Sequence, residues 1–215
     1  MRGGKLAGWL ALVGSLAGLN YASRFSSGKP PADSLYRYDT AISGFFFYAL
    51  TLAIVVLIAR GLTPSELGLR RPSSWPRALG FTLGVLVALL IAEALLEQLL
   101  HGAREQGLEP AHWNSAKAAQ FALNAALVVL VAPVVEEFTF RGVGFRLLSP
   151  FGSVIAVLGT ATAFAADHGL VEGFPALLLF GVAVALVRLR TGSLYPGMLL
   201  HGSFNAFALA VAVAH

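Results

Sequence analysis

The sequence predicts an all-α fold, a polytopic transmembrane bundle of seven or eight helices. Hydrophobic residues make up 57% of the 215-residue chain and charged residues only 12%, whereas soluble domains carry about 25% charged residues. The mean hydropathy is +0.74, so too little polar surface is available to coat a water-soluble globule. Apolar runs near the roughly 20 residues that a helix needs to cross a bilayer follow one another along the chain. We therefore expect an integral, multi-pass membrane protein whose solvent is the lipid bilayer.

Each apolar run is expected to form one spanning helix. The runs are 6–23, 41–59, 78–97, 118–136, 150–167, 173–189 and 194–214. The first follows Arg2 and Lys5 as a secretory signal would, but it lacks a clean cleavage pattern and is read as an uncleaved span. In the second, Phe45-Phe46-Phe47-Tyr48 is expected to contact lipid. Pro133 removes a backbone donor from the fourth helix and is expected to kink it. The stretch 138–148, rich in Phe and Gly, can prolong that helix or form an eighth.

The charged residues predict how the chain is oriented in the membrane. For seven spans, ten of the fifteen Lys and Arg fall on the N-terminal side, which places the N-terminus in the cytoplasm. Seven spans would put the C-terminus outside and eight would put it inside. The Ala-, Leu- and Arg-rich composition with short loops points to a bacterial cytoplasmic membrane. Because the basic residues lie between apolar runs, no nucleic-acid partner is expected, and the chain has no Cys for disulfides or thiolate sites.

Three short motifs place ionisable and polar residues in or beside three of the last four runs. They are Glu136-Glu137-x-x-x-Arg141, Phe164-x-x-x-His168 and His201-x-x-x-Asn205. A charged side chain at the centre of a membrane helix costs roughly 2.5–3.5 kcal/mol on insertion scales. Three ionisable groups within six residues therefore need a compensating reason, for which catalysis and transport are the first candidates.

The spacing of these residues suggests how they divide the chemistry. Glu137 and Arg141 share a helix face and can pair, whereas Glu136 points elsewhere and is left freer to act as a base. We assign Glu136 to removal of a proton from water, with His168 assisting. His201 and Asn205 lie side by side and would stabilise the oxyanion of a carbonyl under attack. The predicted reaction is hydrolysis of a peptide bond.

A metal-dependent version would use the same residues. Glu136, His168 and His201 could bind zinc from three helices and leave a position open for water. No His-Glu-x-x-His motif is present, and Asn205 is a poor zinc ligand. A glutamate mechanism without a cofactor is therefore favoured, and zinc is kept as the alternative.

At these residues the chain resembles the CAAX prenyl endopeptidase and bacteriocin-processing family of intramembrane proteases, called CPBP or Abi. Its signature is the same ordered trio of motifs on separate helices, and Phe140-Arg141-Gly142 adds to the match. The resemblance covers roughly 118–215, which we treat as a catalytic core that follows about three N-terminal spans in 1–117. It implies a helical protease with a site inside the membrane. It also implies the base role for Glu136, the assisting role for His168, and an oxyanion hole made by His201 and Asn205.

The implied partner is a membrane-associated or lipidated peptide, and the sequence selects no particular one, nor an oligomeric state. Two other functions stay open. One is a proton-coupled transporter, in which the glutamates and histidines relay protons. The other is a non-catalytic scaffold or immunity protein that keeps the fold without the chemistry.

Overall fold

The computed structural model describes residues 2–27, 33–100 and 113–214, and the regular structure in these ranges is entirely helical. Within these three ranges, six helices are long and apolar enough to cross a membrane. These are α1 (Arg2–Ser27), α2 (Tyr38–Ala59), α3 (Trp75–Leu100), a composite helix over Ser115–Phe151, α9 (Phe174–Thr191) and α10 (Tyr195–Ala214). The seventh expected span is the shorter α8 (Ser153–Asp167). The prediction of an all-α membrane bundle is confirmed.

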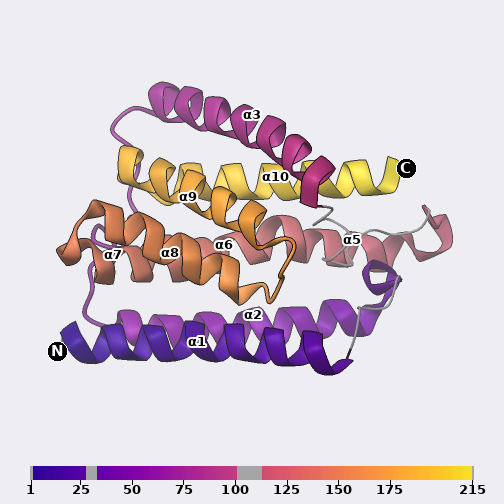
Figure 1. Cartoon of the computed structure of the whole chain (residues 1–215), viewed down its shortest axis with the longest axis horizontal. Coiled ribbons are helices and arrows are strands. Elements are labelled where there is room, and N and C mark those ends of the chain that lie inside the picture. Colours follow the sequence, from indigo (N-terminus) through magenta and orange to yellow (C-terminus); the bar gives the residue numbers. More distant parts are fainter. Residues whose placement is uncertain (1, 28–32, 101–112, 215) are drawn as a thin grey trace.

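The helices run along the long axis of the molecule, and the N- and C-termini lie at opposite ends (Figure 1). This arrangement agrees with an odd number of passes, so the stretch 138–148 prolongs the fourth helix and forms no eighth. Many large apolar side chains face outward, among them Phe46 at 73% exposure and Leu19 at 67%. Such a surface suits acyl chains rather than water.

The composite helix changes its winding twice around the glutamates. Its segments are η2 (Ser115–Lys117), α5 (Ala118–Ala126), η3 (Leu127–Val131), α6 (Ala132–Glu137), η4 (Phe138–Gly144), α7 (Phe145–Leu148) and η5 (Ser149–Phe151). Both η3 and η4 are π-helical, a winding found mostly as short bulges and often at functional sites. Pro133 is the second residue after η3, and the N–H of Ala132, the first residue after it, bonds back to Leu127 O. The i→i−4 hydrogen bonds of the fourth helix, which were expected to break near Pro133, are therefore interrupted by a π turn just before it.

Helix α8 ends well inside the bundle. Its 15 residues span about 22 Å at 1.5 Å per residue, less than the roughly 30 Å of a hydrocarbon core. The turn that follows is covered by α1, because Asn20 donates to Asp167 O and the hydroxyl of Tyr21 donates to Leu170 O at 3.0 Å. Gly169 at φ +64° lies so close to Asn20 that a Cβ would meet it at 2.8 Å. Non-helical backbone at membrane depth is tolerated where protein supplies such partners.

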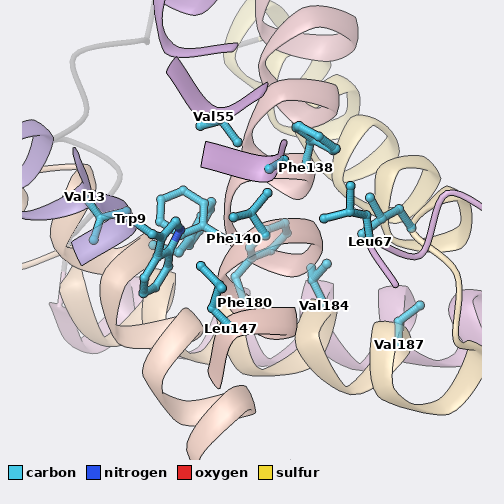
Figure 2. Packing of buried hydrophobic residues seen from close by; sticks show 14 of the residues in the cluster. Trp9, Val13, Val55, Leu67, Phe138, Phe140, Leu147, Phe180, Val184 and Val187 are labelled. Carbon is cyan, nitrogen blue, oxygen red and sulfur yellow. The ribbon is translucent and has the colours of Figure 1, made fainter. Parts of the chain in front are cut away.

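One hydrophobic core joins the N-terminal helices to the composite helix and α9 (Figure 2). Trp9 of α1 is 1% exposed and donates through Nε1 to Thr139 O at 3.0 Å. Its ring lies against Gly144, where a Cβ would come within 2.3 Å of it. Phe140, next to Thr139, is also 1% exposed. The contact holds η4 firmly against α1 and fixes the segment that carries Arg141.

The connection 60–74 is tied to α7 and α9 by charged groups. Arg146 Nη2 lies 2.6 Å from Glu66 Oε1. Arg188 donates through Nη2 to Glu66 O at 3.3 Å and through Nε to Arg141 O at 3.2 Å. Hydrogen bonds from the backbone and side chain of Thr63 and from Arg146 lower the pKa of Glu66 from 4.5 to about 2. This end of the molecule therefore braces η4 through the backbone of Arg141.

Candidate active site

Glu137 and Arg141 form an ion pair in the interior of the bundle. Both residues are 0% exposed, and Arg141 Nη1 lies 3.1 Å from Glu137 Oε1. Arg141 also donates through Nη2 to Gly181 O of α9 at 2.9 Å, and its Cζ lies 4.5 Å from the ring centre of Phe164. Glu137 Oε2 has no hydrogen-bond partner in the structure. The pair that the i, i+4 spacing predicted is present, and it links the composite helix to α8 and α9.

His201 of α10 lies between the two glutamates. Its Nδ1 is 3.1 Å from Glu137 Oε1, and its Nε2 is 3.6 Å from Glu136 Oε2. The ring is 3% exposed and packs edge-on against Phe180 with 4.8 Å between ring centres. When the Nδ1–H of His201 donates to Glu137, the neutral ring carries no proton on Nε2. Nε2 and the Glu136 carboxylate then attract each other only if one of the two is protonated. His201 therefore lies between both carboxylates, with its Nε2 just beyond hydrogen-bond distance of Glu136.

Glu136 is held by Tyr48, which was expected to contact lipid. The hydroxyl of Tyr48 in α2 donates to Glu136 Oε1 at 2.6 Å. The lipid prediction agrees with Phe45, Phe46 and Phe47, which are exposed by 37%, 73% and 41%, but it is wrong for Tyr48. The reason is the rotation of α2, which turns position 48 toward the bundle. The sequence could have indicated this, because Tyr48 ends a run of phenylalanines and the hydroxyl of a buried tyrosine usually finds a hydrogen-bond partner.

His168 lies beside the glutamates without a direct hydrogen bond to them. It follows the last residue of α8, and its Nδ1–H donates to Phe164 O at 2.9 Å, so Nε2 is the nitrogen left to accept. Its ring centre is 4.6 Å from that of Phe164, as expected if the aromatic ring braces the imidazole. His168 interacts electrostatically with Glu136 and His201. Phe164 in turn lies 5.8 Å from His201 between ring centres, so it contacts both imidazoles.

Asn205 uses its amide to complete the backbone of the π turn. Its Nδ2 donates to Val128 O at 2.8 Å. Val128 O is the i−5 partner that Pro133, which lacks an N–H, is unable to bond. Gly202 permits the close approach of α10, because a Cβ there would lie 2.7 Å from Val129 O. The structure thus gives Asn205 a partner that the motif alone did not indicate, and its oxyanion role stays a prediction.

A groove of about 640 Å³ borders this site between the composite helix and α10. Pro133 and Val134 line it from α6, and Met198 and Leu199 line it from α10. These positions lie about one helical turn before Glu137 and His201, respectively. The groove is also lined by Arg70, Arg71, Trp75 and Tyr195. The groove is mostly apolar, and none of the six predicted site residues lines it, so it ends about one turn short of Glu137 and His201.

A zinc ion would need at least three protein ligands around one point. In the ranges that the structure describes, no group of three or more His, Cys, Asp or Glu side chains is arranged to hold a metal ion. Glu136 and His201 approach each other, but His168 does not complete a ligand trio with them. The donor set does not fit the proposed zinc site in this conformation, and we derive no step through a metal.

These features define a class of protein: a multi-pass helical membrane protein with paired carboxylates, an arginine and two imidazoles in its interior. Residues 118–207 match the family model of the type II CAAX prenyl endopeptidase Rce1-like proteins. This segment, which contains all six predicted site residues, is therefore similar to the CAAX prenyl endopeptidases of that family. No curated protein and no solved structure matched the chain.

Proposed function

We propose that this protein is an intramembrane endopeptidase in which Glu136 activates the attacking water. The observation that carries the proposal is the position of the Glu136 carboxylate. It is 9% exposed, one oxygen accepts from Tyr48, and the other lies 3.6 Å from His201 Nε2. A buried carboxylate that has an imidazole close by is suited to act as a general base. The family match adds the reaction class, cleavage of a peptide bond in a membrane setting.

The proposed reaction begins when Glu136 takes a proton from water and the hydroxide adds to the carbonyl carbon. The carbonyl π electrons move to oxygen, and the resulting oxyanion accepts hydrogen bonds from His201 Nε2–H and the Asn205 amide. Glu137 lies at Nδ1 of His201, where its carboxylate would stabilise the doubly protonated ring that such a donor requires. The oxyanion then collapses, the C–N bond breaks, and the leaving amine takes the proton from Glu136. His168, with Nε2 open, assists this return of the proton.

We propose that the substrate is a membrane-associated or lipidated peptide. The groove beside Pro133 and Leu199 supports this choice, because its apolar walls reach from the lipid-facing surface to the turn before the carboxylates. Leu199 is 51% exposed, and Leu130 on the opposite wall is 63% exposed. An apolar chain entering from the bilayer would therefore stay in contact with apolar surface throughout its approach.

Glu136→Gln is the test of the proposed function. Purified variant and wild type are reconstituted in liposomes with an internally quenched peptide that carries a prenylated cysteine near its C-terminus. We expect loss of cleavage by at least about 10³-fold with an unchanged elution profile and melting temperature, because the amide cannot remove a proton. A well-folded variant that cleaves as fast as wild type would reject Glu136 as the base. A wild-type protein that cleaves no lipidated peptide, and supports solute or proton flux instead, would favour the transporter.

Metal dependence needs a separate measurement. We propose a metal-free mechanism, so elemental analysis of active protein should find less than about 0.1 zinc per chain, and a strong chelator should leave the rate unchanged. Stoichiometric zinc that is lost together with activity would overturn this proposal.

We also propose that the N-terminus and the connection 60–74 face the cytoplasm of a bacterial cell. Support comes from the arginines of that connection and from Arg146 and Arg188, which gather at one end of the bundle. The chain has no Cys, so single cysteines can report the orientation. In intact spheroplasts, an impermeant maleimide should label Ser115→Cys and not Ser73→Cys. The reverse pattern would invert the topology.

A further inference from the structure

Tyr48 belongs to a stripe of α2 that faces the bundle. Ala41, Thr51, Val55 and Ala59 are buried, and with position 48 included they are spaced by one or two helical turns, as one helix face requires. Phe46, two residues before Tyr48, lies about 160° around the helix from it and is 73% exposed. Tyr48 is therefore a specific inward-facing residue in a helix that lies outside the matched segment 118–207.

Gly44 brings this stripe within reach of the glutamates. It lies one turn before Tyr48, and a Cβ there would come within 2.3 Å of Leu127 Cδ2. The absence of a side chain lets α2 lie directly against the π turn η3 that precedes α6. At that separation the phenol of Tyr48 spans the remaining gap, and its hydroxyl reaches Glu136 Oε1 at 2.6 Å.

The two oxygens of Glu136 have different surroundings as a result. Oε1 accepts a short hydrogen bond from Tyr48, whereas Oε2 faces His201 Nε2 at 3.6 Å. A gap of that length is longer than a hydrogen bond, so Oε2 is the oxygen that remains available to a water. A carboxylate that is fixed at one oxygen also loses the freedom to turn the other away from its target.

We propose that Tyr48 is a positioning residue of the protease, which holds Glu136 through Oε1 so that Oε2 alone takes the proton from water. The inference rests on the proposed role of Glu136 as the base. It extends the site beyond the matched family segment, because one of its hydrogen bonds comes from α2. Misplacement of a reacting group by about 1 Å can lower a rate 10²-fold, so loss of the Tyr48 hydroxyl should lower the rate of cleavage measurably.

Tyr48→Phe removes the hydroxyl and keeps the ring. We expect kcat for the lipidated peptide to fall about 10- to 100-fold with KM unchanged within about twofold, because substrate binding does not involve this hydroxyl. Incorporation of 4-aminophenylalanine at position 48 restores an N–H donor and should recover most of kcat. Tyr38→Phe is the matched control, since Tyr38 lies in the same helix and is 49% exposed; its kinetics should equal those of wild type.

A second measurement tests the contact without any activity. Thermal unfolding of Tyr48→Phe, Glu136→Gln and the double variant forms a mutant cycle, and the shifts should be clearly non-additive because the two groups contact each other. Additive shifts would overturn the inference. A wild-type kcat for Tyr48→Phe would also overturn the inference. If Glu136→Gln is inactive in the same assay, the proposed function would still stand. An active Glu136→Gln protein would reject the proposed function itself.

Discussion

Replacing Arg141 by Met should be among the most destabilising single changes in this protein. The side chain is fully buried, donates to Glu137 at 3.1 Å and to Gly181 O at 2.9 Å, and lies 4.5 Å from the ring centre of Phe164. Methionine fills similar space but leaves the Glu137 carboxylate without its cation. Breaking one side of a buried ion pair costs about 3–5 kcal/mol, which corresponds to a roughly 10²–10⁴-fold change in the folding equilibrium.

The assay is reversible unfolding in mixed detergent micelles, followed by the fluorescence of the chain's tryptophans. A matched variant, Glu137→Gln combined with Arg141→Met, removes the charge that the single change leaves unpaired. We expect the double variant to regain part of the lost free energy of unfolding. A loss below about 1 kcal/mol for Arg141→Met would refute the reasoning, and so would a double variant whose loss equals the sum of the two single losses.

Three further outcomes follow from other contacts. Asn205→Leu leaves Val128 O without its donor, and we expect about 1–3 kcal/mol less stability together with a lower kcat; Asn205→Asp is the comparison, because it keeps the shape but not the donor. Glu66→Gln should remove a contribution to stability that depends on pH. Since the folded pKa of Glu66 is lowered from 4.5 to about 2, this contribution is complete above pH 4.5 and is lost as the pH falls toward 2. Leu199→Trp fills the groove beside the site and should raise KM for a lipidated peptide about tenfold with kcat little changed.

Each of these outcomes has a result that would contradict it. Equal stability and kcat for Asn205→Leu and wild type would show that water or another group satisfies Val128 O. A constant difference in stability between wild type and Glu66→Gln across the acid range would show that the Thr63 and Arg146 hydrogen bonds do not lower the pKa of Glu66 in the folded state. An unchanged KM in Leu199→Trp would show that the substrate approaches from another side.

The local parts of the site were predictable from the sequence, because a helix fixes them. Glu137 and Arg141 are four residues apart, and the pair forms as the spacing requires. Phe164 likewise contacts His168 across one turn. The membrane bundle followed from composition and run length alone. The sequence did not predict that the fourth helix is prolonged, because the Phe- and Gly-rich stretch 138–148 was compatible both with a longer fourth helix and with a separate eighth one.

The relations between helices were not predictable in the same way. The inward rotation of Tyr48 depends on the packing of Gly44 against Leu127, two residues whose contact no motif announces. His201 was expected to face a substrate oxyanion, but its position between two carboxylates depends on where α10 crosses α6. The partner of Asn205 depends on a π turn, and helix periodicity assumes that no such turn interrupts the ladder. Distances across a bundle are set by side-chain packing rather than by spacing along one helix.

The two π turns that flank α6 have a consequence for how the chain tolerates changes in length. A π turn holds one residue more than an α-helical turn, so deleting one residue from 127–131 would restore ordinary winding and leave the upstream half of the composite helix in nearly its present rotation toward α2. Each α-helical residue advances by about 100°, so a deletion within 118–126 would instead turn the residues upstream of it by that angle. We expect one deletion in 127–131 to be tolerated better than one in 118–126, and a one-residue change in the connection 60–74, which lies outside any helix, to leave the angular phase of the doublet intact.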